Sequence, residues 1–223
     1  MRLNVLKLAF SWLVALLVLR VLASILTNYP DYYPPNFHSL FLQGREASFQ
    51  GAYRIAFYTH IVFSPVVLLV GLILMSDRLR RHWRGLHRGL GYVQVSVLLL
   101  FVLPSSLVMA RQAFGGWPAG LSFALLSVMT AFCTAVGVVY ARRRRYDLHR
   151  QWMNRSYLLI CSAVFLRLFA GITSVFHLPT VEGEYIVSAW CSWLLPLLVH
   201  EMVVWWRTHR PEIRRADRDV PTS

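Results

Sequence analysis

The tripeptide Leu-His-Arg occurs twice, around His87 and around His149, each time between a basic run and an apolar run. Neutral imidazole is a common axial ligand of haem iron, and guanidinium groups pair well with carboxylates such as haem propionates. We therefore predict that His87 and His149 bind haem b and that Arg88 and Arg150 contact its propionates. The alternative is that both histidines only anchor their helices at the membrane surface, where polar and aromatic anchors are common.

Further histidines extend this pattern to a second depth. His200 is expected on the same side of the membrane as the Leu-His-Arg copies, whereas His60 and His177 are expected on the opposite side. Haem irons at two depths could pass an electron across a bilayer, with their potentials set by ligation and burial. The predicted metal ligands are His60, His87, His149 and His200, and His177 is a further predicted cofactor contact.

Two arginines stand inside apolar runs, Arg20 in VLRVL and Arg167 in FLRLF. A charge at the centre of a membrane helix costs at least about 2.5 kcal/mol unless it is paired or faces a wet cavity. Glu201 can pair with only one of the two arginines, which leaves a positive surplus. We predict that these three residues bind a small or lipidic anion. The alternative is that the arginines reach the interface or bond backbone carbonyls.

The elements that carry these residues follow from composition. The chain has 223 residues, of which 57% are hydrophobic and 15% charged, whereas about a quarter of a soluble domain is charged. Six apolar runs have the roughly twenty residues that a helix needs to cross a bilayer; they cover about 8–26, 55–75, 90–109, 121–140, 157–176 and 186–206. Backbone groups in lipid are satisfied within helices or closed barrels, and no strand-like alternation supports a barrel. We predict an all-α, polytopic bundle of six transmembrane helices over residues 1–210 and a disordered cytoplasmic tail at 211–223.

The arrangement of the six predicted helices follows from charge and spacing. Most of the 23 Lys and Arg residues fall on one side of the spans, so the positive-inside rule places both termini in the cytoplasm. His87 and His149 are one helical hairpin apart, so helices 3 and 4 are predicted to recur in parallel as helices 5 and 6. Short basic loops beside apolar spans contact lipid, which argues against nucleic-acid binding.

Longer motifs carry a family resemblance. THxxxxPxxLLxG at 59–71, LHRxLGY at 86–92 and HRxWMxRSYxL from 149 resemble a bacterial family of predicted multi-pass membrane proteins of unknown function, over roughly residues 50–210. The resemblance implies the fold and a location in a bacterial inner membrane. It marks as motif positions His60, His87, His149, Arg150, Met153, Arg155 and Arg167. The layout more distantly resembles b-type dihaem transmembrane cytochromes, whose histidines lie deeper in the lipid zone than His87 and His149 do here.

Three functions are compatible with this sequence. We expect an integral membrane protein that transfers electrons through haem, with a redox partner. The alternatives are a transporter or binding protein for a small or lipidic anion, and an accessory scaffold subunit recognised by another membrane protein. Enzymatic activity is left open, because neither a nucleophile–base pair nor an HExxH-type metal site is found in the sequence.

Overall fold

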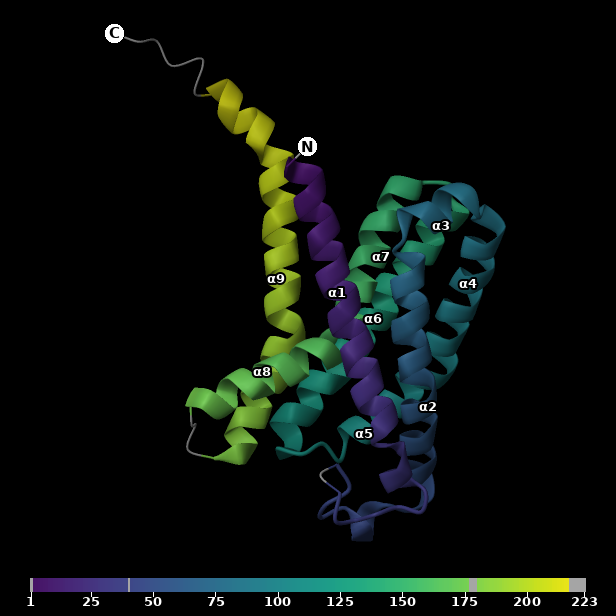
Figure 1. Ribbon diagram of the computed structural model, residues 1–223, viewed down its shortest axis with the longest axis vertical. Helices are drawn as coiled ribbons and strands as arrows, with labels where there is room; N and C mark the ends of the chain where they lie inside the picture. The colour runs from purple at the N-terminus through teal and green to yellow at the C-terminus, as the bar shows by residue number, and fades with distance from the viewer. Residues whose placement is uncertain (1, 40, 177–179, 217–223) are drawn as a thin grey trace.

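The computed structural model describes residues 2–39, 41–176 and 180–216, and it describes side chains within 12–39, 41–172 and 180–209. Over these residues the chain is built from helices and has no strand (Figure 1). The α-helices are α1 (Arg2–Thr27), α2 (Gly51–Leu74), α3 (Asp77–His82), α4 (Arg84–Val97), α5 (Leu103–Ala110), α6 (Gly116–Arg142), α7 (Tyr146–Ile160), α8 (Ser162–Phe176) and α9 (Val181–Ala216). A π-helical segment, η3 (Leu98–Val102), joins α4 to α5, and the 3-10 helices η1 (Tyr29–Tyr32) and η2 (Glu46–Ser48) lie between α1 and α2.

Four helical segments in the described chain are long and apolar enough to cross a membrane: Gly51–Leu74, Arg84–Ala110, Gly116–Arg142 and Val181–His209. The bent pair of α7 and α8 would make a fifth span. The apolar part of α1, Trp12–Thr27, is shorter. The prediction of an all-α, polytopic membrane protein is therefore confirmed with four to five candidate spans. The count of six and the hairpin repeat stay predictions.

The fifth predicted span differs most from the structure. It was expected as one helix over 157–176, but α7 begins at Tyr146 and α8 is bent away from it by 44°. The first half of α7 is polar, so a hydropathy count does not include it in a membrane span, although His149 within it donates to the Gly137 carbonyl of α6. At the other end, α9 continues as a helix to Ala216, past the predicted boundary at 210, and the rest of the predicted tail lies outside the described residues.

The two Leu-His-Arg copies occupy equivalent positions in the backbone. His87 and His149 are each the fourth residue of their helix, and their amides donate to the carbonyls of Trp83 and Arg145. Both histidines lie at one end of the bundle, which carries α3 at the top of Figure 1 and is called the LHR end below. The irregular segment η3 begins eleven residues after His87, and the bend after α7 lies twelve residues after His149.

The core places α1 against the bend. Val18, Val21 and Leu22 of α1 are buried in one cluster with Tyr157 and Val164 from either side of the α7–α8 bend. In Figure 1, α1 crosses the front of the bundle while α8 extends sideways from it. The helices α1 and α8 therefore meet at an angle and diverge on either side of their contact.

An aromatic cluster closes the end of the bundle opposite the LHR end. Leu42, Phe49, Tyr53 and Phe57 are buried together, and the phenol of Tyr58 donates a hydrogen bond of 2.9 Å to the carbonyl of Tyr32. The phenol of Tyr29 also donates to the carbonyl of Ile61. These contacts fix the segment between α1 and α2 on the end of α2, and they carry η1 to the neighbourhood of α8.

Candidate functional site

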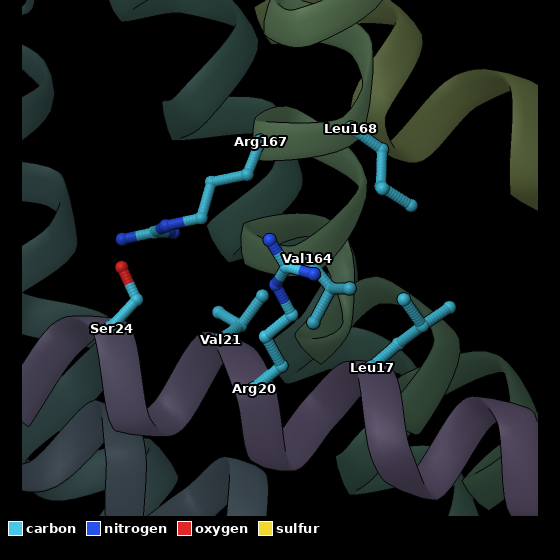
Figure 2. A pocket seen from close by; sticks show the side chains of 7 residues that line it. All are labelled: Leu17, Arg20, Val21, Ser24, Val164, Arg167 and Leu168. Atoms are coloured by element: carbon cyan, nitrogen blue, oxygen red, sulfur yellow. The ribbon is translucent and has the colours of Figure 1, made fainter.

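A pocket of about 380 Å³ lies where α1 and α8 diverge (Figure 2). Its walls come from two helices and combine four aliphatic side chains with two guanidinium groups and one hydroxyl; they are Leu17, Arg20, Val21, Ser24, Val164, Arg167 and Leu168. Arg20 and Ser24 rise from α1, and Arg167 reaches down from α8 until its guanidinium faces the Ser24 hydroxyl (Figure 2). The pocket thus brings together two of the three residues that the sequence predicts to bind an anion.

The positive charge in this pocket has no carboxylate partner among the described residues. Arg167 Nη1 donates to the Ala163 carbonyl of its own helix at 2.9 Å, which satisfies one of its five N–H groups. Within the described residues neither Arg20 nor Arg167 forms an ion pair with a carboxylate. Two cations therefore line one pocket together with a single neutral hydroxyl.

The bend between α7 and α8 positions Arg167. Tyr157 and Cys161 hold the end of α7 in the core, and the amides of Val164 and Phe165 both donate to the Cys161 carbonyl, which starts the new helix direction. Val164 then points into the core beside α1, so that Arg167, close to one turn later, faces the gap between the two helices. A straight α7–α8 helix would carry this guanidinium away from α1.

The segment η1 contributes to the electrostatics of the same pocket. Burial raises the pKa of the Tyr32 phenol, and the nearby Arg167 guanidinium lowers it by a smaller amount. The net direction is upward from a usual value near 10, so Tyr32 is neutral at pH 7 and leaves the charge of Arg167 unbalanced. Tyr32 lies outside the candidate spans, on the side of the pocket away from the LHR end.

Glu201, the third predicted anion-site residue, lies elsewhere. Its two carboxylate oxygens accept from Arg155 Nε at 2.6 Å and Arg155 Nη2 at 2.8 Å, a two-point ion pair between α9 and α7. The Arg155 guanidinium also lies over the Trp152 ring at 5.0 Å. The Arg155 side chain is 16% exposed and that of Glu201 is 42% exposed. Glu201 is therefore already paired with Arg155, and within the described residues no ion pair joins it to Arg20 or Arg167.

His60 lies in a polar joint between α2 and the α4–η3–α5 segment. Its Nδ1 is 3.2 Å from Ser106 Oγ and 3.4 Å from Ser105 Oγ. The two hydroxyls donate their protons to the carbonyls of Val102 and Phe101, at 2.6 Å and 2.7 Å, beside the π-helical turn. In the tautomer that leaves both hydroxyl protons on these carbonyls, Nδ1 carries the hydrogen and Nε2 keeps its lone pair; in the other tautomer Nδ1 accepts from a serine hydroxyl. The serine hydroxyls thus satisfy backbone carbonyls near Pro104. A histidine whose Nδ1 is held by hydrogen bonds, with Nε2 left over, also has the geometry of a metal ligand.

At the LHR end the two Leu-His-Arg copies approach each other. His149 Nδ1 lies 2.8 Å from the Gly137 carbonyl, which can only accept, so Nδ1 donates a hydrogen to it. In the neutral imidazole this leaves the lone pair on Nε2. His87 is close enough to His149 for an electrostatic interaction, and its buried Nδ1 has no hydrogen-bond partner among the described residues. These two imidazoles therefore lie at the same end of the bundle, and their sharing of one cofactor stays a prediction.

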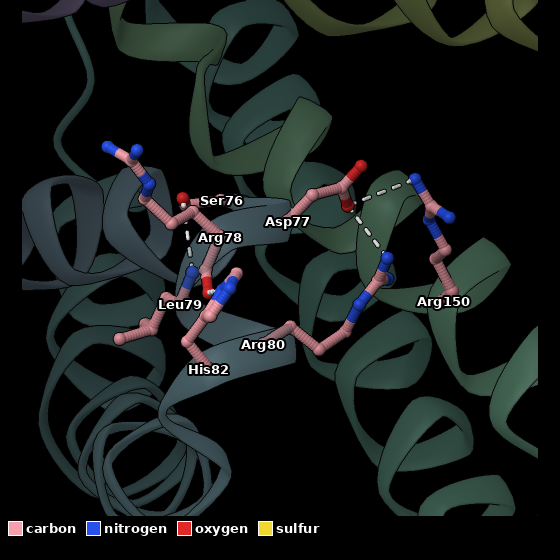
Figure 3. Close-up of polar contacts among 7 residues, drawn as sticks. All are labelled: Ser76, Asp77, Arg78, Leu79, Arg80, His82 and Arg150. Atoms are coloured by element: carbon pink, nitrogen blue, oxygen red, sulfur yellow. Dashed lines mark hydrogen bonds and ion pairs between the residues drawn. The ribbon is translucent and has the colours of Figure 1, made fainter.

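The arginines of the two copies behave differently. Arg150 reaches across to Asp77 at the start of α3, with a distance of 3.4 Å to Oδ1, and Arg80 binds the same oxygen at 2.7 Å (Figure 3). Ser76 caps α3 by accepting from the Leu79 amide, which fixes Asp77 in the first turn. Arg88 is exposed. Arg150, in the second Leu-His-Arg copy, therefore connects α7 to α3, the helix directly before the first copy.

The remaining predicted ligands do not join this pair. His200 lies on α9 beside the Arg155–Glu201 ion pair, with which it interacts electrostatically. His177 falls outside the described residues. Over the part of the chain that the structure describes, no group of three or more His, Cys, Asp or Glu side chains is gathered closely enough to hold a metal ion. The four predicted metal ligands thus do not form one cluster.

Comparison with known proteins supplies the family. Residues 57–204 match the family described as "Predicted membrane protein (DUF2306)". The chain belongs to this family. The predicted resemblance to a membrane protein family of unknown function is thereby confirmed, whereas the individual motifs and the likeness to dihaem cytochromes stay predictions. No curated protein and no solved structure matches the chain.

The DUF2306 region and the pocket coincide only in part. The matched residues run from α2 to α9 and include Arg167 and the bend that positions it, as well as both Leu-His-Arg copies. Arg20 and Ser24 on α1 precede the matched region. The α1–α8 pocket of this DUF2306 protein is therefore formed between the family region and a helix that lies outside it.

Proposed function

We propose that this DUF2306 protein binds an anion within the membrane, in the pocket between α1 and α8. The observation that supports this proposal is that Arg20 and Arg167 line one pocket and have no carboxylate partner among the described residues. Each uncompensated charge at membrane depth costs at least about 2.5 kcal/mol, and an anion between them would offset both costs. The pocket volume of about 380 Å³ also falls in the range of about 300–1,000 Å³ that is usual for small-ligand sites.

The residues of the pocket have distinct roles in this proposal. The guanidinium groups approach from different helices, so a tetrahedral or planar oxyanion could be bound by both at once through charge-assisted hydrogen bonds. The Ser24 hydroxyl would supply a third, neutral donor. The pocket adjoins the bent α7–α8 pair, and transporters commonly place substrate sites at such discontinuous spans. Movement of α8 relative to α1 would open or close the site, which makes transport of the anion the natural extension of binding.

Replacing Arg167 by glutamine should remove a bound anion while leaving the protein folded. The substitution deletes one of two cations but keeps a polar side chain of similar length, so at least about tenfold of affinity should be lost. The measurement is native mass spectrometry of protein purified from its membrane in mild detergent, which detects a ligand that co-purifies. The matched control is Arg143→Gln, which should keep the ligand. Arg143 is an exposed arginine directly after the last residue of α6, and it does not line the pocket. A co-purified anion that is equally abundant in Arg167→Gln would disprove the site.

A second proposal concerns haem binding at the LHR end. His149 has the arrangement of a ligand histidine, with Nδ1 held by a carbonyl and Nε2 free, and His87 has an unsatisfied buried nitrogen nearby. These two residues would hold the iron, and haem would supply one-electron redox chemistry. Arg88 is exposed and available to a propionate, whereas Arg150 already contacts Asp77. His60 stands apart in its own polar joint.

The haem proposal predicts a reduced-minus-oxidised visible spectrum with a Soret difference band in protein expressed with ample haem. The band should disappear in both His87→Ala and His149→Ala, because each removes one axial ligand. It should persist in His82→Ala, which lies in the same basic run and bonds only the Arg78 carbonyl. If the wild-type protein shows no Soret band, the two histidines do not bind haem, and they act as anchors of α4 and α7.

A further inference from the structure

We infer that the anion is the phosphomonoester head group of a membrane lipid, which enters the α1–α8 pocket sideways from the bilayer. This inference rests on the proposed anion site and adds the class of its ligand and the route by which the ligand arrives. It depends on three observations: which side chains surround the opening, what lines the interior, and how much charge has to be balanced.

The surface around the pocket is apolar on both helices. On α1, Leu16 and Leu19 are 61% and 48% exposed, and on α8, Leu168 and Ile172 are 41% and 49% exposed. Side chains of this kind on a membrane protein face acyl chains rather than water. Leu168 itself lines the pocket, and each of the other three lies within one helical turn of a lining residue. A pocket between two such surfaces would open toward the hydrocarbon of the bilayer, so a ligand that reaches it sideways would pass through lipid.

The interior of the pocket has one polar side and one apolar side. Arg20, Ser24 and Arg167 provide the donors, whereas the aliphatic side chains among the lining residues form the rest of the wall, namely Leu17, Val21, Val164 and Leu168. A small hydrophilic anion would leave this aliphatic surface without a partner. A lipid satisfies both sides at once, because its head group meets the guanidinium groups and the first carbons of its chain cover the leucines and valines.

The charge of the site selects among lipid head groups. Two guanidinium groups carry a charge of +2, and no carboxylate in the described residues offsets it. A phosphomonoester carries about −1.5 to −2 at neutral pH and offers three acceptor oxygens, as phosphorylated side chains do. A carboxylate or a phosphodiester carries only −1 and would leave one arginine uncompensated. A phosphomonoester therefore matches both the charge and the number of donors.

The inference is tested by titrating the purified full-length protein in detergent and following ligand binding by native mass spectrometry. The probes are dioleoyl phosphatidic acid, dioleoyl phosphatidylglycerol, oleate and glycerol 3-phosphate, which separate the monoester, the diester, the carboxylate and the water-soluble head group. Phosphatidic acid should bind at least about tenfold more tightly than phosphatidylglycerol or oleate, and glycerol 3-phosphate should bind most weakly of all. Arg20→Gln and Arg167→Gln should each lose this preference, whereas Arg143→Gln should keep it.

The outcomes separate this inference from the proposed function. If glycerol 3-phosphate binds as tightly as phosphatidic acid and depends on both arginines, the anion site stands and the lipid route is wrong. If phosphatidic acid and phosphatidylglycerol bind equally, still through both arginines, the match to a doubly charged head group is wrong. If no probe binds in an arginine-dependent way, both the site and the inference fail. Unfolding curves for each variant show whether a lost affinity reflects the pocket or the fold.

Discussion

Replacing Ser24 by aspartate is expected to stabilise the protein and to abolish anion binding. The new carboxylate would stand on α1 where the Ser24 hydroxyl now faces the Arg167 guanidinium (Figure 2). A charge-assisted hydrogen bond contributes about 1.5–3 kcal/mol. A negative charge in the last turn of α1 opposes the helix dipole and costs about 0.3–1 kcal/mol. The first effect is larger, so the free energy of unfolding should rise by about 1 kcal/mol while the carboxylate takes the place of the ligand.

The control for this experiment is Ser24→Asn, which has nearly the same shape and no charge. It should give no stabilisation, because an amide does not neutralise the arginines, and it should retain more of the affinity for phosphatidic acid than Ser24→Asp. Thermal unfolding in detergent and native mass spectrometry measure the two effects separately. If Ser24→Asp destabilises the protein as much as Ser24→Asn or more, the guanidinium groups are not short of an anion.

Removing one member of the Arg155–Glu201 ion pair is expected to destabilise the bundle. Arg155 makes two hydrogen bonds to Glu201, and its side chain is only 16% exposed. Breaking a buried pair from one side costs about 3–5 kcal/mol, because the other charge is left without compensation. Because Glu201 is 42% exposed and water screens the pair, we expect a smaller loss of about 1–3 kcal/mol, with the larger loss in Glu201→Gln, which leaves the more buried Arg155 without its partner.

The double variant Arg155→Gln/Glu201→Gln distinguishes this explanation from a simple loss of contacts. With both charges gone, no unpaired ion remains between α7 and α9, so the double variant should be more stable than either single variant. The free energies of unfolding of the wild-type protein, the two single variants and the double variant, measured with denaturant, give the double-mutant cycle. If the two single effects simply add, the residues do not act as a pair. Anion binding should survive in the double variant, because neither residue lines the α1–α8 pocket.

The helical membrane fold could be predicted because hydropathy depends mainly on composition over about twenty residues. The same count misses helices that carry polar groups on a buried face. The start of α7 is such a case, since His149 bonds the Gly137 carbonyl and Arg155 binds Glu201. A run of polar residues looks like a loop in the sequence, but these residues are partnered by α6 and α9. The 44° bend between α7 and α8 also could not be predicted, because no proline or glycine lies at the junction.

The candidate site could be predicted in its residue types but not in its pairing. A cation inside an apolar run indicates a binding site, because a charge in a membrane helix has a high free-energy cost unless it is compensated. Arg20 and Arg167 could be identified from the sequence for this reason. Their shared pocket depends on how α1 crosses α8, and Ser24 gives no signal because serine is common in membrane helices. Glu201 was grouped with these arginines on depth alone, and the structure instead pairs it with Arg155, which was marked only as a motif position.

We propose that Arg20 and Arg167 together bind one anionic head group. The most direct measurement is an experimental structure of the protein determined with phosphatidic acid in the surrounding lipid. We expect density for one phosphate between α1 and α8, within hydrogen-bonding distance of both guanidinium groups and of Ser24. An acyl chain should leave the pocket past Leu168. Guanidinium groups that turn away from each other, with only unbroken hydrocarbon between α1 and α8, would contradict it.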